Sequence, residues 1–506
     1  MKKDEYFFEY PDFNNVKEMI YYVAEKYSSH TAFILKDKKG KEINYIYKTF
    51  IDFLEDINNL GTGFLGAGLK DKKIAIIGKN RYECVLSYTT TLLVNMVVIP
   101  LDKGLTEIEV ENSINKSTPD VIIFDESVKE TIENIKKNGN TQIQEFICMD
   151  KTEEYKYLYD ILDEGKKIRE SGNKEFENVE IDSNKASELC FTSGTSSTSK
   201  IVMLSQRNIA FDICAMHATE DFRDTDVNLA FLPLHHTFGS TGVLYILSYG
   251  AATAFPDGLR YIAQNLKEYG VSVFIGVPLL VESMYKKLTK EVEKQGKTKL
   301  INIMRKVTNI LPFTKRKVFK PIIDQLGGKL RLIISGAAGL DKDVWKGFNE
   351  LGIKIIQGYG LTEAAPVVAA ENFKYGKKGS IGFPMKGIQV KIIDKNELGI
   401  GELAVKGENV MLGYYEDEEA NKNTFTEDGW LLTGDLAYID KEGFIFITGR
   451  KKNVIVLKNG KNIYPEEIET LVNKIPLVKE SMVFGLPKAD DMVLSIKVQY
   501  DIEYVN

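Results

Sequence analysis

Between two apolar segments the chain reads Phe191-Thr192-Ser193-Gly194-Thr195-Ser196-Ser197-Thr198-Ser199-Lys200. These hydroxyl side chains do not suit a packed core, because each buried hydroxyl would need its own hydrogen-bond partner. They suit a loop around an anion, in which glycine lets the backbone amides turn inward, the hydroxyls donate and the lysine adds a positive charge. The sequence therefore predicts a polyphosphate-binding loop, with a solvated Ser/Thr/Gly linker as the alternative.

The segments on both sides of this loop favour phosphate binding. Residues 186–191 and 201–204 are apolar runs typical of buried strands, and a loop held between two strands is fixed in place. The separation of Gly194 and Lys200 also matches the nucleoside-triphosphate loop of kinases and GTPases. That class is excluded, because Ser199 stands where its motif needs glycine and Ile201 where it needs Ser or Thr.

The composition indicates an ordinary globular protein. The 506 residues are enough for about three domains, and a net charge of −6 argues against general nucleic-acid binding. The four cysteines have no paired short spacing, so we expect neither disulfides nor a zinc site, and a reducing cytoplasm is the expected location. We also expect no secretory signal and no transmembrane segment, since the most apolar run covers about half a membrane span.

Apolar strands alternate with helical segments along most of the chain, which predicts an α/β fold with two parallel sheets, each covered on both faces. The first series follows an amphipathic helix, a hairpin of 32–35 with 42–45 and a helix over 49–64, and its strands are 73–77, 96–101 and 120–124. The second series has strands at 229–232, 252–255, 271–275, 330–335 and 353–356. From about residue 380, short β segments with frequent glycine predict a small antiparallel barrel or sheet.

Residues 286–329 form a basic segment with 13 Lys or Arg and only 3 acidic residues. Solvated surface helices are the favoured interpretation. The alternative is a patch that attracts anionic lipid or helps to collect a lipid substrate. Such a patch would place the cytoplasmic protein at the inner face of the membrane, without a transmembrane segment.

Further candidate residues follow predicted strands. Gln357-Gly358-Tyr359-Gly360-Leu361-Thr362-Glu363 comes directly after a buried strand, at the sheet edge where α/β proteins bind ligands. There Tyr359 can stack on a planar ring, Thr362 can donate to a phosphate, and Glu363 can hold Mg²⁺ that bridges phosphates. The turn Ser335-Gly336-Ala337-Ala338-Gly339 leaves room for a flat ligand beside it. Structural or merely exposed side chains are the alternative for Tyr359 and Glu363.

Two charged turns and a histidine pair complete the candidates. Asp435, in Thr433-Gly434-Asp435, is suited to a ribose diol, and Arg450, in Thr448-Gly449-Arg450, to a ribose or phosphate. A salt bridge across a hairpin is the alternative, and it is the favoured one for either residue taken alone. His235 and His236 are adjacent on an extended segment and point to opposite sides, so joint metal binding is not expected. His236 is interpreted as a pocket wall, with a core histidine as the alternative.

In this order the motifs resemble those of the AMP-forming acyl-CoA synthetases of the adenylate-forming superfamily. Within that superfamily, the long basic insert before Leu330 resembles the long-chain fatty-acid branch. The resemblance implies that a fatty acid and ATP give acyl-AMP and pyrophosphate, and that the acyl group then passes to CoA with release of AMP. ATP, Mg²⁺ and CoA are the implied cofactor and co-substrates, and no nucleic acid is implied.

The resemblance also implies roles for individual residues. The implied catalytic residues are Thr192, Lys200, Thr362 and Glu363, of which Glu363 is also the implied metal ligand. The implied ATP- and AMP-binding residues are Thr192, Ser193, Gly194, Thr195, Ser196, Ser197, Lys200, Gly336, Ala337, Ala338, Gln357, Gly358, Tyr359, Gly360, Thr362, Asp435 and Arg450. The implied acyl-pocket residues are His236, Phe238 and Gly239. Lys452 is the implied hinge, and the turn at Gly460 is expected to approach the pantetheine of CoA.

By the same resemblance, residues 1–449 form the adenylate-forming N-terminal domain and 450–506 the start of a mobile α+β C-terminal domain. The family's loop usually has glycine at Ser197, proline at Ser199 and glycine at Ile201, and its C-terminal domain continues further and carries a lysine needed for adenylation. We therefore expect a shortened form of a longer enzyme. The alternatives are a protein that binds nucleotide and acyl group without turnover, and an acyl-AMP ligase that loads a carrier protein.

Overall fold

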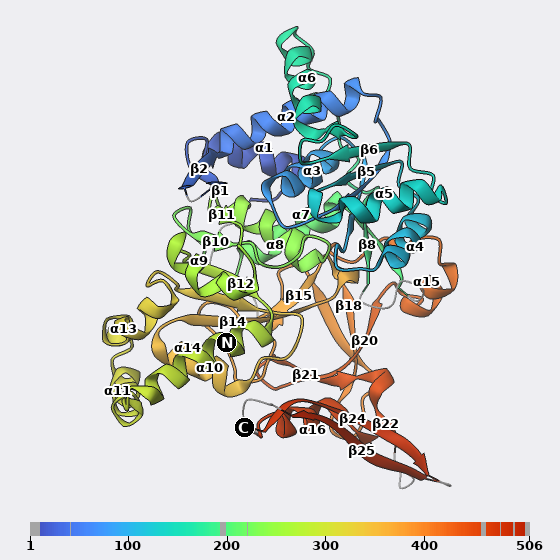
Figure 1. The fold of residues 1–506 in the computed structure, drawn as a ribbon. Coiled ribbons are helices and arrows are strands. Elements are labelled where there is room, and N and C mark those ends of the chain that lie inside the picture. The colour runs from blue at the N-terminus through green and yellow to red at the C-terminus, as the bar shows by residue number, and fades with distance from the viewer. Residues whose placement is uncertain are drawn as a thin grey trace.

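The computed structural model describes residues 11–40, 42–192, 199–219, 221–456, 462–475, 477–488 and 491–500. Two large α/β sheets with their helices form the upper and middle parts of Figure 1, and a small antiparallel sheet and a C-terminal hairpin continue toward the lower right. The predicted α/β fold class, with a smaller C-terminal part, is confirmed. Within the described ranges, no helix combines the length and the apolar character that crossing a bilayer requires.

The first sheet has eight strands in the order β19-β9-β8-β4-β3-β5-β6-β7. Their bounds are β3 (Lys73–Ile77), β4 (Val97–Leu101), β5 (Val121–Phe124), β6 (Glu145–Cys148), β7 (Lys156–Tyr157), β8 (Ala186–Phe191), β9 (Ile201–Ser205) and β19 (Gly413–Tyr414). Strands β3 to β8 run parallel, whereas β9 is antiparallel to β8 and β19 is antiparallel to β9. The strands β3, β4 and β5 lie within one residue of their predicted bounds.

Side chains of the first sheet alternate between two cores. Ala75 and Ile77 pack on one face with side chains of α4 (Glu107–Ser117) and α5 (Lys129–Asn138). Ile74 and Ile76 lie on the other face in a larger core, which also contains side chains of the helices α2 (Phe50–Gly66), α3 (Tyr82–Leu92) and α6 (Leu158–Glu170). Because strand side chains alternate with period two, a sheet covered on both faces needs apolar residues throughout, as predicted.

The second sheet has nine strands in the order β16-β15-β14-β13-β12-β10-β11-β1-β2. Their bounds are β1 (Thr31–Lys39), β2 (Glu42–Thr49), β10 (Val227–Leu229), β11 (Ala252–Ala254), β12 (Val273–Gly276), β13 (Leu332–Ser335), β14 (Lys354–Gly360), β15 (Val367–Ala370) and β16 (Phe383–Pro384). Strand β1 pairs parallel with β11, with Phe33 opposite Thr253. The predicted N-terminal hairpin is therefore an edge of this second sheet, because β2 continues from β1 in antiparallel pairing.

The predicted strand over 229–232 extends too far. Strand β10 ends at Leu229, whose carbonyl accepts from Phe231 in a tight turn. Beyond it, the carbonyls of Ala230 and Leu232 both accept from the side chain of Asn80, at 3.1 and 2.6 Å. A side chain from the first α/β part thus takes the place of a neighbouring strand at this end of β10.

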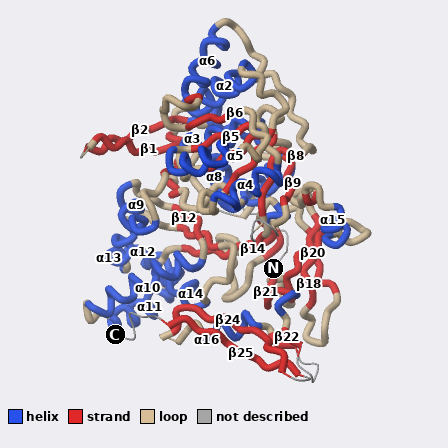
Figure 2. Tube along the Cα trace, turned by 45° about the vertical axis from the view of Figure 1, so that its right-hand side comes forward, coloured by secondary structure: helices blue, strands red, loops and turns tan. Residues whose placement is uncertain are grey.

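The large core also joins the two sheets. It combines Ile74 of β3 with Val273 and Leu332 of the second sheet, and with side chains of α1 (Val16–Lys26), α7 (Gln206–His217) and α8 (Thr237–Ser248). The outer face of the second sheet is covered by helices in a separate core. These helices and their neighbours are α9 (Ile262–Glu268), α10 (Pro278–Lys294), α11 (Thr298–Ile310), α12 (Lys315–Val318), α13 (Lys320–Ile323) and α14 (Lys342–Leu351). Figure 2 shows α9 to α14 together along one side of the molecule.

The third sheet is antiparallel, with the order β17-β18-β20-β21. Its bounds are β17 (Gln389–Ile393), β18 (Gly401–Lys406), β20 (Leu431–Ile439) and β21 (Ile445–Arg450), and α15 (Glu418–Thr424) precedes β20. Of the two predicted forms, barrel or sheet, the described strands form a sheet with an open order. The C-terminal part then contains β22 (Ile455–Val456), β23 (Asn462–Ile463), α16 (Pro465–Val472), β24 (Val478–Lys488) and β25 (Asp491–Tyr500).

Candidate active site

A cavity of about 1030 Å³ lies where the second sheet meets the end of the first sheet and the antiparallel sheet. Many of the residues singled out in the sequence line it: Thr192, Lys200, His236, Phe238, Gly336, Ala337, Gly358, Tyr359, Gly360, Thr362, Glu363, Arg450 and Lys452. Of the other predicted site residues, Gly239, Ala338, Gln357 and Asp435 do not line it. Ser193, Gly194, Thr195, Ser196, Ser197 and Gly460 lie outside the described residues.

The cavity opens at the carboxyl ends of β12, β13 and β14, which pair in parallel in the second sheet. Gly336 and Ala337 follow β13, and Gly358 and Gly360 end β14, which is where open α/β sheets bind ligands. A Cβ at Gly360 would lie 2.1 Å from the carbonyl oxygen of Pro366, so the close approach of β14 to β15 requires glycine there. Glycine at 360 therefore allows the backbones of β14 and β15 to approach each other closely at this edge of the sheet.

The two ends of the predicted phosphate loop are joined to each other. The backbone N–H of Thr192 donates to the Lys200 carbonyl at 2.9 Å, and the N–H of Lys200 donates to the Thr192 hydroxyl at 3.1 Å. Both residues come directly from the antiparallel pair β8 and β9. The strands thus deliver one hydroxyl and one ammonium side chain to the same wall of the cavity.

Glu363 is connected to Lys200 through a residue that the sequence analysis missed, Tyr414. The Tyr414 hydroxyl donates to Glu363 Oε1 at 2.8 Å, and Lys200 Nζ lies 4.4 Å from the centre of the Tyr414 ring. Burial raises the pKa of Tyr414, and the negative charge of the neighbouring Glu363 raises it further. The hydroxyl therefore stays protonated and can donate its hydrogen bond to Glu363. The short strand β19 places Tyr414 opposite Val202 of β9. Only this pairing between distant segments reveals the contact, since nothing in the local sequence marks Tyr414.

Glu363 is also the carboxylate best placed to hold a cation. One oxygen accepts from Tyr414, and no described residue donates to the other oxygen. Within the described ranges, no cluster of three or more His, Cys, Asp or Glu side chains forms a metal site. A single carboxylate fits Mg²⁺, which keeps several waters and otherwise binds substrate phosphates, better than it fits a metal with an all-protein ligand set.

Asp435 lies behind the cavity wall and uses both carboxylate oxygens. Oδ2 accepts from the Tyr359 hydroxyl at 2.6 Å, and Oδ1 lies 2.8 Å from Arg450 Nε. Burial raises the pKa of Asp435, although Tyr359 and Arg450 act in the opposite direction. Asp435 and Arg450 are directly opposite each other on β20 and β21. The salt bridge across a hairpin, the alternative in the sequence analysis, is present. Asp435 thus holds two residues that line the cavity, Tyr359 and Arg450.

A second ion pair at the rim was also missed in the sequence. Lys451 Nζ lies 2.6 Å from Glu402 Oε2, and the other oxygen of Glu402 accepts from the N–H of Gly434 at 3.1 Å. The turn that carries Lys452 is further tied to α16, because Glu466 accepts from the side chain of Asn453 at 2.8 Å. The predicted hinge residue therefore sits between the antiparallel sheet and the C-terminal part.

The other end of the cavity is apolar. Its walls come from α7, α8, β12, β13, β14 and the loops next to them, and they include Met216, Leu232, Phe238, Gly242, Tyr245, Ile275, Val277, Ile334 and Ile356. A Cβ at Gly242 would meet only Ile275 Cδ1, at 3.7 Å, so a glycine in the middle of α8 leaves open space here. We call this end the apolar arm.

His236, Phe238 and Gly239 lie at the start of α8, beside the apolar arm. His236 precedes α8 and its carbonyl accepts from Gly239 at 2.7 Å. A Cβ at Gly239 would lie 2.0 Å from the Pro233 carbonyl oxygen, so this glycine lets α8 begin against that segment. Desolvation lowers the pKa of His236 below its usual value, which keeps the ring neutral at neutral pH.

Two residues predicted to bind the nucleotide, Gln357 and Ala338, lie away from the cavity lining. The side chain of Gln357 is buried, accepting from the N–H of Leu340 at 3.0 Å and donating to the Ser380 carbonyl at 3.1 Å. Its hydrogen bonds therefore hold the turn after β13 in place. Ala338 is exposed in that turn. A role for either residue in nucleotide binding stays a prediction.

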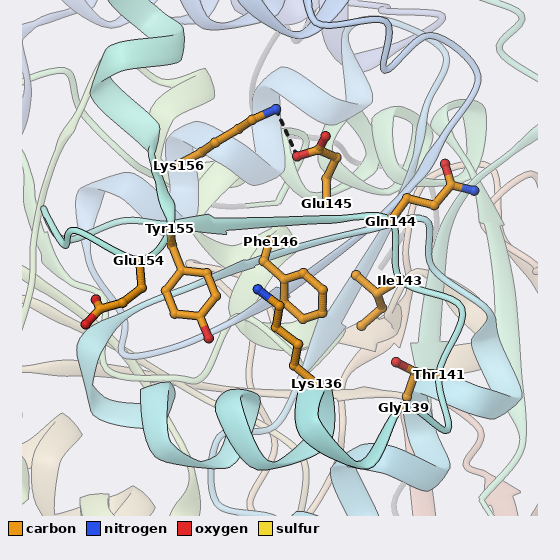
Figure 3. Close-up of a pocket in the computed structure, with 10 residues that line it drawn as sticks. All are labelled: Lys136, Gly139, Thr141, Ile143, Gln144, Glu145, Phe146, Glu154, Tyr155 and Lys156. Atoms are coloured by element: carbon orange, nitrogen blue, oxygen red, sulfur yellow. Dashed lines mark ion pairs between the residues drawn. The ribbon is translucent and has the colours of Figure 1, made fainter.

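A second hollow, of about 430 Å³, lies by β6 and β7, at the opposite edge of the first sheet from β9 (Figure 3). Its charged groups are already engaged. Lys136 Nζ lies 4.9 Å from the Phe146 ring centre and 4.8 Å from that of Tyr155, and Lys156 pairs with Glu145 at 3.0 Å. None of its residues was a predicted site residue, and the large cavity is the candidate active site.

The chain is similar in sequence to known proteins. Residues 21–415 match the family described as AMP-binding enzyme. The chain is 27% identical over 491 residues to fatty acyl-CoA synthetase B of Dictyostelium discoideum, covering 89% of this chain and 71% of that protein. It is 30% identical over 463 residues to long-chain-fatty-acid-CoA ligase 5 of Rattus norvegicus, covering 84% of this chain and 67% of that protein. The chain thus spans about two thirds of the length of these relatives.

Solved structures share the fold. The o-succinylbenzoate CoA synthetase of Bacillus subtilis, in complex with its acyl-adenylate intermediate, superimposes with a TM-score of 0.74 at 22% identity, covering 96% of this chain and 88% of that chain. The same enzyme in complex with ATP and magnesium ion gives a TM-score of 0.72 at 22% identity, covering 95% of this chain and 89% of that chain. At this identity the likeness concerns the architecture alone.

Proposed function

The chain belongs to the AMP-binding enzyme family, and on that premise we propose that it activates a long-chain fatty acid with ATP and transfers the acyl group to CoA. In the first step a carboxylate oxygen attacks the α-phosphorus of ATP, which gives acyl-AMP and pyrophosphate. In the second step the CoA thiol attacks the acyl carbon, and AMP leaves. The relatives named as fatty acyl-CoA synthetase B and long-chain-fatty-acid-CoA ligase 5 support this reaction class.

One observation carries the proposal: a single cavity contains both a cluster of charged residues and the apolar arm. This charged cluster consists of Lys200, Glu363, Arg450 and Lys452, and it forms the charged end of the cavity. A small polar acid has no alkyl chain to bury against an apolar wall. A nucleotide bound at the charged cluster would leave this wall without a ligand. An alkyl chain gains free energy by leaving water for such a wall, roughly 0.8 kcal/mol for each CH₂ group. The arm therefore favours a fatty acid over acetate.

The charged cluster has the groups that the first step needs. Lys200 and the Thr192 hydroxyl are suited to the phosphates, and Tyr359 is suited to stack on the adenine. Glu363 would hold Mg²⁺, which would offset the negative charge that develops on the leaving pyrophosphate. Tyr414 holds Glu363 and Lys200 near each other, so these opposite charges need little reorganisation when the phosphates bind.

The second step needs a route for the thiol. We assign this route to the rim formed by residues 450–453, because Lys452 lines the cavity there and Glu466 of α16 holds the same turn. A rotation of the C-terminal part about this turn would change which side chains face the cavity. The roles of CoA and of Lys452 are part of the proposal.

The proposal is tested by acid-dependent release of pyrophosphate, with acids from acetate to oleate and with Glu363→Ala as the blank. Release with long acids above the blank is the expected result. The product is then followed with CoA and with a carrier-protein thiol as acceptors. The same assay is run on a form extended at the C-terminus, because the family's lysine for adenylation lies there. Binding of ATP without release for any acid in both forms would contradict the enzyme and favour a nucleotide and acyl binder. Transfer only to the carrier thiol would favour an acyl-AMP ligase.

A further inference from the structure

Helix α11 lies at the outer edge of the molecule, beyond α10 and α14 (Figures 1 and 2). One face of this helix packs inward. Ile301 and Met304 contact the core on the outer side of the second sheet, and Thr308 is the buried residue of the helix. These three residues are spaced by three and four, as one face of a helix requires. The other faces of α11 are open.

The open side carries an apolar stripe made of Leu300, Ile303, Val307 and Ile310. The exposed fractions are 54% for Leu300, 61% for Ile303, 54% for Val307 and 80% for Ile310. Their spacing of three, four and three residues aligns them along the helix, and the exposed Phe313 follows just beyond its end. Single exposed apolar residues are common, but an aligned group marks a surface that is covered in use.

Basic residues border the stripe. Lys299 and Lys306 each lie one helical turn from Ile303, and no described acidic side chain is within ion-pair distance of either. The wider segment 286–329 has 13 basic and 3 acidic residues in a chain whose net charge is −6. This positive charge is therefore a local property of the surface around α11.

We infer that this stripe docks on the surface of an anionic lipid bilayer. In this arrangement α11 lies in the plane of the interface, with the stripe among the upper acyl chains and Lys299 and Lys306 at the headgroups. A second copy of the chain is a poorer occupant, because a symmetric contact would bring the same lysines of both copies together. Docking does not depend on the proposed chemistry, since none of these residues lines the large cavity.

The test is cosedimentation of the whole chain with phosphatidylcholine vesicles, with and without phosphatidylglycerol, and without ATP or fatty acid. We expect partition onto the anionic vesicles to exceed that onto the neutral ones by about tenfold or more. Raising the salt from about 0.1 M to about 1 M should remove most of this difference, because the screening length falls from about 10 Å to about 3 Å.

Two pairs of substitutions separate the apolar and the charged contributions. Ile303→Gln with Val307→Gln should lower partition onto anionic vesicles about tenfold without changing charge. Lys299→Gln with Lys306→Gln should lower it about tenfold on anionic vesicles and leave the neutral ones unchanged. Glutamine is a good helix former, and circular dichroism with thermal unfolding checks that each variant keeps the fold of the wild type.

The matched control is Leu398→Gln, because Leu398 is 78% exposed in the turn between β17 and β18, away from α11. This variant should bind vesicles as the wild type does. The inference is wrong if the wild type does not bind, if it binds neutral and anionic vesicles equally, or if the control loses as much as the α11 variants. It is also wrong if the Ile303 and Val307 variant instead turns a dimer into a monomer in sedimentation, because the stripe would then be a contact between copies.

Discussion

The two ends of the large cavity are built in opposite ways. At the charged end Glu363 is held by Tyr414, and behind the wall Asp435 is held by Tyr359 and Arg450. At the apolar arm the walls are aliphatic and aromatic side chains, and the glycine at 242 leaves space. The charged end is thus preorganised for the reaction at the phosphates, whereas the space in the apolar arm selects the acid by the volume of its acyl chain. Changes at the charged end should affect every acid alike, and changes in the arm should affect acids according to length.

The largest effect is expected from Glu363→Gln. This substitution keeps the size of the side chain and an oxygen that accepts from Tyr414, but removes the negative charge. We expect the kcat for pyrophosphate release to fall about 10²- to 10³-fold for every acid, because one preorganised electrostatic contact is lost. Steady-state rates with short and long acids over a magnesium titration measure it. A fall in kcat confined to long acids would contradict the separate roles of the charged end and the apolar arm.

Gly242→Leu should have a smaller effect that depends on the acid. The leucine side chain fills the open space beside Ile275, so we expect kcat/KM for long acids to fall about 10- to 100-fold while short acids keep theirs. The control is Gly242→Ala, whose Cβ would make an ordinary contact at 3.7 Å. Alanine should also stabilise α8 by up to about 1 kcal/mol. An equal loss with acetate and oleate would place Gly242 outside the acyl site.

Tyr414→Phe should lower the rate for all acids by about three- to tenfold, the value of one hydrogen bond. The ring that Lys200 contacts remains, and only the donor to Glu363 is removed. Tyr415→Phe is the matched control, because the Tyr415 hydroxyl accepts from Lys73 at 3.3 Å and is the next residue in the chain. If both variants have the same rate, Tyr414 does not position the charged end.

The smallest effect is expected from pH at the apolar arm. Desolvation lowers the pKa of His236, and that of His235 to about 4, so both rings are neutral above their lowered pKa values and do not titrate as the pH rises further. We expect the ratio of rates for long and short acids to change less than about twofold between about pH 7 and pH 9. The ratio is compared between the wild type and His236→Gln. An inflection in this range that the variant abolishes would show that His236 changes charge there.

Regular structure was predictable where local pattern determines it. The apolar runs at 73–77 and 96–101 are strands within one residue, because both faces of that sheet are covered. The end of β10 was not predictable, because Asn80, which is distant in the sequence, donates hydrogen bonds to the carbonyls of Ala230 and Leu232. The partner of the N-terminal hairpin was not predictable either, because the pairing of Phe33 with Thr253 joins distant parts of the chain.

The site residues also divide into those that local sequence predicts and those that only contacts between distant segments reveal. Thr192, Glu363 and Arg450 were found from short motifs at strand ends, and the structure brings them to one cavity. Tyr414 and Glu402 were missed, because each is recognised only by the group it contacts after folding. Family membership was also predictable from the order of the motifs, and the match over residues 21–415 confirms it.

The pairing of β1 with β11 also has a consequence for synthesis of the chain. Phe33 leaves the ribosome more than 200 residues before Thr253, its partner in the sheet. At a usual rate of synthesis this interval is roughly 10 to 40 s. During that time the inner edge of β1 has no strand to pair with, and unpaired edges invite contacts with other chains. The N-terminal hairpin is thus a part of the newborn polypeptide that benefits from protection by a chaperone.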